Sequence, residues 1–97
     1  MIFKKTGRQI MIDVWLDPID EYEEIWVKQD ETVRGLKRMI RYHLDINVED
    51  QVLIHTHNIM KDKKKLSDYK IRHGSLVRMV SRKKIAKIRE HEYLKEG

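Results

Sequence analysis

The chain has 97 residues, of which 40% are hydrophobic and 38% are charged, with a formal net charge of +5 and no cysteine. This length allows one small domain rather than two, and the lack of cysteine excludes a disulfide framework and a cysteine-based zinc site. No apolar run approaches the about 20 residues of a membrane-spanning helix, and residues 1–10 are too polar for a secretory signal, so we expect a soluble protein of the cytoplasm or nucleus.

Residues 11–16 and 24–28 are the first two predicted strands. Apolar residues alternate on one face of each: Ile12, Val14 and Leu16 in the first, and Ile25 and Val27 in the second. A period of two is typical of a strand with one buried face. Asp17 and Pro18 begin a turn, because proline fixes its own φ and disfavours helix in the preceding residue. The two strands are therefore predicted to form an antiparallel hairpin with an acidic connection.

A helix is predicted to begin after Thr32, whose hydroxyl can accept a hydrogen bond from an unpaired backbone N–H. Asp30 and Glu31 place negative charge where the helix dipole favours it. Apolar residues then recur at helical spacing, namely Val33, Leu36, Ile40 and either His43 or Leu44. Gly35 lies inside this helix, where it should cost about 0.5–1 kcal/mol relative to alanine.

Four further segments complete the predicted order. They are a third strand at 51–56, a short strand near 59–60 after a turn at 57–58, a helical turn at 66–71 and a last strand at 75–80. A sheet with one helix across it would bury both amphipathic faces in one core, which predicts an α+β domain over residues 11–80. Residues 1–10 are then an N-terminal extension, and residues 81–97 are a basic tail that we predict to be helical.

The order and spacing of several motifs resemble ubiquitin. Residues 32–40 (Thr-Val-x-x-Leu-Lys-x-x-Ile) have the residue types of the ubiquitin helix, and 53–54 (Leu-Ile) follow at the distance of its third strand. Residues 66–71 (Leu-Ser-Asp-Tyr-x-Ile) and 77–80 (Val-x-Met-Val) are similar to the segments that end the ubiquitin fold. The resemblance implies a ubiquitin-like β-grasp, with a mixed sheet and one main helix, to which the tail adds a helical extension.

Structural roles follow from this resemblance. The implied core consists of Ile12, Val14, Ile25, Val27, Val33, Leu36, Ile40, Leu53, Met60, Leu66, Ile71, Val77 and Met79. Lys37 and Asp62 occupy the positions of a lysine–aspartate pair in ubiquitin. The Tyr69 hydroxyl would hold the backbone near Lys61, since a buried phenol seeks a partner. Glu23 falls where ubiquitin has an apolar residue, which leaves the register of the second strand open.

One motif is similar to a particular group, the spliceosomal, non-conjugated family named for homology to ubiquitin. The shared residues are 59–62 (Ile-Met-Lys-Asp, with phenylalanine as the second residue in that family) and 66–74 (Leu-Ser-Asp-Tyr-Lys-Ile-Arg-His-Gly). That family ends in paired tyrosines soon after its last strand, whereas this chain has Val80, Ser81 and then the basic tail. The resemblance implies a role in mRNA splicing.

Covalent attachment in the ubiquitin family needs an exposed C-terminal diglycine, because an activating enzyme must reach a slender carboxylate. At the corresponding place this chain has Ile85 and Ala86, and Gly-Gly occurs nowhere in it. We therefore expect a protein that is not conjugated through its C-terminus. It would instead bind protein partners, as an adaptor or as a subunit of a multi-subunit complex.

The resemblance places the partner-binding site on an apolar patch of the sheet. Ile54 and Val80 match two members of the ubiquitin patch, and Ile19 stands near the third. Arg78 takes the place of a patch histidine, and Arg82 matches a basic neighbour. The alternative is that Ile54 and Val80 are ordinary sheet residues, because isolated exposed apolar side chains are common.

Trp15 and Trp26 point outward if the alternating valines of their strands point inward. Tryptophan is enriched at binding hot spots, which makes both residues candidates for partner binding. The interpretation that we favour is that residues 1–10 or the tail cover them, since these segments supply Ile2, Phe3, Ile85 and Ile88. A helix as short as the tail would be marginal alone in water and would need a docking surface.

Two basic clusters support an alternative function in nucleic-acid binding, with RNA as a possible partner. They are Lys61, Lys63, Lys64 and Lys65 in a loop, and Arg82, Lys83 and Lys84 in the tail. The simpler interpretation is solvated charge, because both clusters occupy loop or tail positions.

Catalytic patterns are weak. His55 and His57 would place two imidazoles on one strand face, whereas zinc usually has three or four ligands. There is no glycine-rich phosphate loop and no recognisable nucleophile pattern. We therefore expect no enzymatic activity, no metal or other cofactor, no small-molecule substrate and no association with a membrane.

Overall fold

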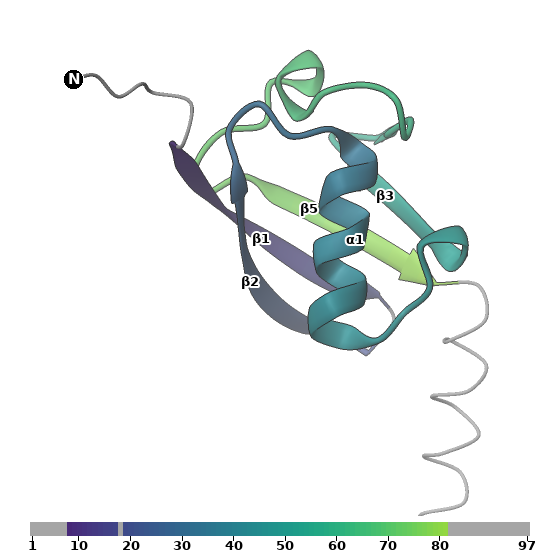
Figure 1. The fold of residues 1–97 in the computed structure, drawn as a ribbon. Coiled ribbons are helices and arrows are strands. Elements are labelled where there is room, and N and C mark those ends of the chain that lie inside the picture. The colour runs from purple at the N-terminus through teal and green to yellow at the C-terminus, as the bar shows by residue number, and fades with distance from the viewer. Residues whose placement is uncertain (1–7, 18, 82–97) are drawn as a thin grey trace, which may run out of the picture.

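The computed structural model describes residues 8–17 and 19–81, in which one helix lies across one face of a twisted sheet (Figure 1). The strands described are β1 (Gln9–Asp17), β2 (Glu21–Lys28), β3 (Gln51–His55), β4 (Asn58–Ile59) and β5 (Leu76–Ser81). The helix is α1 (Val33–Leu44), and 3₁₀ turns occur at Val48–Asp50 and Leu66–Tyr69. The predicted helical tail lies outside the described residues.

The sheet has the strand order β2-β1-β5-β3-β4. Strands β1 and β5 are parallel neighbours at its centre, and the other neighbouring pairs are antiparallel. A mixed sheet covered by one main helix is the predicted ubiquitin-like β-grasp, so the predicted fold class is confirmed. The helical turn expected at 66–71 is the 3₁₀ turn Leu66–Tyr69.

The register of the first hairpin settles the position of Glu23. Ile12 pairs with Ile25 and Ile10 pairs with Val27, so Glu23 pairs with Val14 on the inner face and is half-buried. Strand β1 begins two residues before the predicted strand. Ile10 is therefore part of the core, and the expectation that the segment 1–10 covers the outside of the sheet is wrong for this residue.

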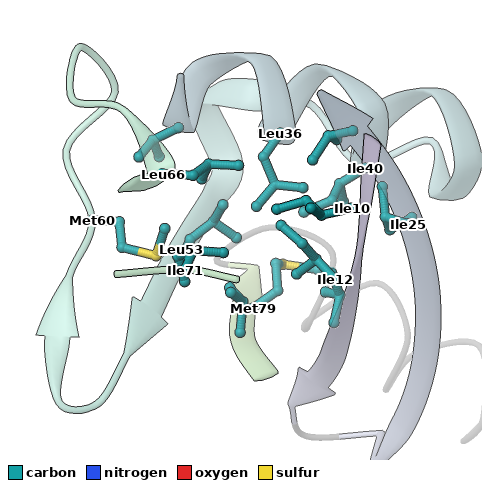
Figure 2. Close-up of a cluster of buried hydrophobic side chains, with 14 of the residues drawn as sticks. Ile10, Ile12, Ile25, Leu36, Ile40, Leu53, Met60, Leu66, Ile71 and Met79 are labelled. Carbon is teal, nitrogen blue, oxygen red and sulfur yellow. The ribbon is translucent and has the colours of Figure 1, made fainter. Parts of the chain in front are cut away.

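The core lies between α1 and the inner face of the sheet, where side chains from the helix and the strands meet (Figure 2). Each predicted core residue is buried, and the structure adds Ile10, Leu16 and Ile46. Of the two alternatives for the last inward residue of the helix, Leu44 packs against this core and His43 is exposed. The pattern confirms that a period of 3.6 in α1 and of two in the strands directs the same faces inward.

Helix α1 begins as predicted, with Thr32 as its N-cap. The Thr32 hydroxyl accepts a hydrogen bond of 3.1 Å from the Gly35 N–H. A Cβ added at Gly35 would clash with Oε2 of Glu31, and this oxygen accepts a hydrogen bond of 3.1 Å from the Thr32 N–H. Glycine at this position therefore leaves space for the Glu31 carboxylate to satisfy a backbone donor at the helix start.

The turn between β3 and β4 consists of Thr56 and His57, one residue earlier than predicted. Their φ values are 50° and 72°, and His55 pairs with Asn58 across the turn. Positive φ at both central residues is typical of a two-residue type I′ hairpin turn. Strand β3 therefore ends at His55, and His57 does not share a strand face with it. Strand β5 likewise runs from Leu76, one residue later than expected.

Candidate partner-binding face

The face of the sheet opposite α1, here called the outer face, carries one outward side chain from each strand in a single row. The row is Tyr22, Trp15, Arg78, Ile54 and Ile59, in the order β2-β1-β5-β3-β4. The register pairs each of these residues with the next. Paired residues in neighbouring strands direct their side chains to the same face, so this central row crosses the whole sheet.

Trp15 is held from three sides within the central row. Its ring stacks on Tyr22 with centroids 6.4 Å apart and an interplanar angle of 19°. The guanidinium carbon of Arg78 lies 5.6 Å from the centroid of Trp15, within the range of a cation–π interaction. The indole Nε1–H donates a hydrogen bond of 2.9 Å to Asp20 Oδ1. Trp15 is half-buried by these neighbours, all of which belong to the domain itself.

Arg78 is fixed in the middle of the row by Asp17. Its Nε lies 2.9 Å and its Nη2 lies 2.6 Å from Asp17 Oδ2. Charge-assisted bonds of this kind set the orientation of a guanidinium group. The Arg78 side chain keeps 46% of its surface exposed, so a positive charge stands in a defined position on the outer face.

An apolar strip lies beside Arg78 on β3, β4 and β5. It is defined by Val52, Ile54, Ile59, Leu76 and Val80. Ile54 and Val80 are half-buried, whereas Ile59 is 65% and Leu76 is 47% exposed. Ile54 pairs with Ile59, and Val52 pairs with Val80. Sequence reasoning singled out Ile54 and Val80 but missed Ile59, because the turn before it was placed one residue too late.

Two other predicted residues lie apart from the apolar strip. Ile19 is half-buried and packs against the core. Trp26 pairs with Met11, four residues along β1 from Trp15, which corresponds to about 13 Å. Trp26 is 51% exposed, and its ring centroid lies 5.6 Å from that of His73. The His73 Nδ1 accepts a hydrogen bond of 3.0 Å from the Met11 N–H. Arg82 lies outside the described residues.

The family comparison decides what kind of domain carries this face. The model of the ubiquitin family matches residues 21–84, which is more than half of the chain. The chain belongs to the ubiquitin family. A search of curated proteins finds no match.

Two solved structures show how similar other ubiquitin-like domains are to this one. The N-terminal ubiquitin-like domain in the 4931431F19Rik protein is 29% identical, with a TM-score of 0.72 and 84% of each chain covered. The UBL domain of Plasmodium falciparum Dsk2 is 28% identical, also with a TM-score of 0.72, and covers 77% of this chain and 100% of its own. The similarity to the spliceosomal family stays a prediction.

The residues to which the ubiquitin resemblance gave structural roles lie on the other side of the domain. Lys37 Nζ is 2.6 Å from Asp62 Oδ1, and Arg34 Nη1 is 3.2 Å from Asp62 Oδ2. The hydrogen bond from Lys37 is the main reason why the pKa of Asp62 lies below its usual range, although partial burial acts in the opposite direction. The Lys61 N–H donates a hydrogen bond of 2.9 Å to Tyr69 Oη. The Asp62 contacts tie the 61–69 loop of this ubiquitin-like domain to α1, and the Tyr69 bond closes the loop on itself.

The histidines of the β3–β4 hairpin are not brought together as ligands. His55 Nδ1 lies 2.9 Å from the carbonyl oxygen of Leu76, and His57 is exposed in the turn. Within residues 8–17 and 19–81, no three His, Cys, Asp or Glu side chains are grouped so that they could hold a metal ion. No helix in the same part of the chain is long and apolar enough to cross a membrane.

The structure describes one of the two predicted basic clusters. Lys61, Lys63, Lys64 and Lys65 are exposed in the loop that follows β4. The tail residues Arg82, Lys83 and Lys84 lie outside the described residues. The loop and the central row belong to opposite sides of the domain, because the loop contacts the start of α1 through backbone hydrogen bonds from Val33 and Arg34.

Proposed function

We propose that this ubiquitin-like domain is a non-catalytic protein-binding module that acts through the outer face of its sheet. It would serve as an adaptor or as a subunit of a larger assembly in the cytoplasm or nucleus. The observation that carries this proposal is the apolar strip of Val52, Ile54, Ile59, Leu76 and Val80 beside the fixed Arg78.

The geometry of the outer face supports protein binding in two ways. An apolar centre with a charged or polar border is typical of protein interfaces. Here Ile54 pairs with Ile59 on one side and with Arg78 on the other, and Val80 pairs with Asp17. The charged half of the row is also ordered in advance, because Asp17 and Asp20 hold Arg78 and Trp15 in place. A partner would therefore lose little conformational freedom of these side chains on binding.

The proposal includes the absence of conjugation through the C-terminus. Ile85 and Ala86 stand where a conjugated relative carries its diglycine, and their side chains would obstruct access to a slender terminus. A role in a splicing complex is the narrower form of the proposal, supported by the motif at residues 59–62 and 66–74.

Affinity capture from cell extract tests the proposal, with the tagged full chain, the Ile54→Ala/Val80→Ala variant and a Met39→Ala/Val48→Ala control. The control removes half-buried apolar side chains that lie away from the outer face. We expect a discrete set of proteins that survives high salt with the wild type and the control, and that is lost with the outer-face variant. Capture of the same proteins by both variants would refute the outer face as the binding site.

A denatured sample in the same experiment tests conjugation. The tagged chain should run at its own mass after denaturation. High-mass adducts that persist under denaturing conditions would contradict the proposed absence of conjugation, whatever the result for the outer face. Splicing factors among the captured proteins would support a role in a splicing complex, and their absence would contradict that role.

A further inference from the structure

The exposed side of α1 is basic along its whole length. Arg34, Arg38 and Arg41 are exposed, while Val33, Leu36 and Ile40 face the core. The helix, Val33–Leu44, contains no acidic residue. Helix α1 covers the inner face of the sheet (Figure 1). Its exposed arginines therefore belong to a different surface of the domain from the outer face.

Intramolecular contacts neutralise this charge in part. Asp62 accepts hydrogen bonds from both Lys37 and Arg34. Arg41 donates to Asn47 Oδ1, which orients the guanidinium group without neutralising it. Arg38 has no ion pair within residues 8–17 and 19–81.

Arg38 also has like-charged neighbours on the helix surface, Arg34 four residues before it and Arg41 three residues after it. Like charges at these spacings destabilise a helix. The helix dipole favours Arg41 in the last turn, but it offers nothing to Arg38 in the middle. A local cost without a compensating contact is a typical feature of a functional surface.

The loop after β4 continues this surface at the start of the helix. The Val33 N–H donates to the Lys64 carbonyl at 2.8 Å, and the Arg34 N–H donates to the Asp62 carbonyl at 3.1 Å. These bonds place exposed lysines beside the first turn of α1. We define the basic strip as Lys63, Lys64, Lys65, Arg34, Arg38 and Arg41. Its helical part extends over about 10 Å, at 1.5 Å per residue.

An aromatic ring stands at the end of the basic strip. Tyr42 is 81% exposed and lies four residues after Arg38, on the same side of the helix. The ring packs edge-on against His43 with centroids 5.3 Å apart, which leaves most of its surface in solvent. Cationic side chains that follow a backbone, combined with an exposed aromatic ring, are typical of single-stranded nucleic-acid sites. An acidic peptide would explain the charges but not the exposed ring.

We propose that the basic strip and Tyr42 form a binding site for single-stranded nucleic acid. The arginines of α1 and the loop lysines bind successive phosphates, and one base stacks on Tyr42. This function is separate from protein binding by the outer face, because the two surfaces share no residue.

Fluorescence anisotropy of the full chain with a labelled, unstructured RNA of about 12 nucleotides tests the site. For single strands the slope of log K against log salt is about −0.7 for each phosphate contact. The Arg38→Gln/Arg41→Gln variant should therefore bind about tenfold more weakly at low salt, with a slope shallower by about 1.4. Tyr42→Ala should weaken binding about fivefold or more with the slope unchanged, because stacking releases no counterion. Tyr42→Phe should restore the affinity.

The matched control is Lys28→Gln/Arg72→Gln, which removes the same charge from exposed positions outside the basic strip. An equal loss of affinity in this control would overturn the site in favour of a general charge effect. An unchanged affinity of Tyr42→Ala, or equal competition by polyglutamate, would overturn it as well. The site would also be overturned if Arg82→Gln/Lys83→Gln/Lys84→Gln lost binding completely while Arg38→Gln/Arg41→Gln bound as well as the wild type. That result would assign nucleic-acid binding to the tail.

Discussion

Asp62 holds the loop that follows β4 to the helix through two different basic side chains. Lys37 donates to one carboxylate oxygen at 2.6 Å and Arg34 donates to the other at 3.2 Å. The Lys37 side chain is only 10% exposed, so its ammonium group depends on this partner. A nearly buried charge that loses its partner retains its desolvation cost, and for this reason the two residues act as one structural unit.

The pKa of Asp62 predicts how stability varies with pH. Hydrogen bonds from Lys37 and Arg34 lower the pKa of the folded carboxyl below the ordinary value of 3.8 for an aspartate. The carboxylate therefore stabilises the fold above pH 3.8, and this contribution is lost as the pH falls through the lower, folded pKa. The free energy of unfolding, from urea titrations between neutral and acid pH, should fall over this range in the wild type and fall less in Asp62→Asn.

At neutral pH, Asp62→Asn should be less stable than the wild type by about 1–3 kcal/mol, since the Lys37 ammonium group is left without its counterion. Glu49→Gln is the control, because Glu49 is an exposed carboxylate with no ion pair among the described residues, and its urea midpoint should match that of the wild type. Equal stability of Asp62→Asn and the wild type at neutral pH would show that the Lys37–Asp62 contact does not stabilise the fold.

At the scale of single elements, the β3–β4 hairpin is built with a turn that its residues do not favour. Thr56 and His57 both have positive φ, a region in which a β-branched residue such as threonine is rare. The sheet imposes this conformation, because Ile54 pairs with both Arg78 and Ile59 and the register leaves two residues for the turn. Asn-Gly is the preferred sequence for such a turn.

The variant Thr56→Asn/His57→Gly should therefore raise the free energy of unfolding by about 1 kcal/mol, because it relieves backbone strain at both positions. Thr56→Val is the comparison, since it keeps the branched Cβ and should give no gain. Chemical denaturation of the three proteins provides the measurement. An unchanged midpoint in the Asn-Gly variant would mean that the turn carries no strain that these residues can relieve.

Periodicity explains which elements could be predicted from the sequence. Helix α1 and the inward residues of β1 and β2 follow strong apolar patterns, and family motifs placed Lys37, Asp62 and Tyr69. The turn at 56–57 was placed one residue too late, because Thr-His carries no local turn signal. From the sequence alone, Gly35 only weakens the predicted helix. The structure shows that its lack of a side chain leaves space for the Glu31 carboxylate.

The central row on the outer face could not be derived in the same way. It depends on pairing between five strands, which places Tyr22 and Ile59 at its ends, far apart in the sequence. The hydrogen bond from Trp15 goes to Asp20, a residue with a positive φ of 59°, and nothing in the residue pattern indicates this contact. Sequence reasoning therefore found members of the site without finding the contacts that order them.

Across the whole molecule, one core connects α1, the 3₁₀ turn Leu66–Tyr69 and strands β1, β2, β3 and β5, and this connection predicts cooperative unfolding. Leu36 and Ile40 of α1 are fully buried in the same cluster as Ile12, Leu53 and Val77 of the sheet. The helix and the sheet bury their apolar faces against each other, so neither can keep its buried surface alone. Domains of this size usually unfold in a single two-state transition.

Two spectroscopic probes can test this cooperativity. Both tryptophans of the chain, Trp15 and Trp26, are on the outer face of the sheet, whereas far-ultraviolet circular dichroism reports on helical residues, including those of α1. The urea transitions seen by fluorescence and by circular dichroism should coincide in the wild type. They should also shift together by about 0.5–1.5 kcal/mol in Ile40→Val, which removes one methylene group from the core side of the helix.

Leu36→Ala should lower the free energy of unfolding by about 2–5 kcal/mol, which is a large part of the roughly 5–15 kcal/mol of a typical domain. The Ile40→Val variant keeps the test measurable if Leu36→Ala does not fold. A helix signal that is lost before the tryptophan signal, in either variant, would show that the sheet persists without α1. In that case the outer face could bind a partner in a state in which the basic strip is unfolded, whereas coincident transitions would mean that both surfaces are present or absent together.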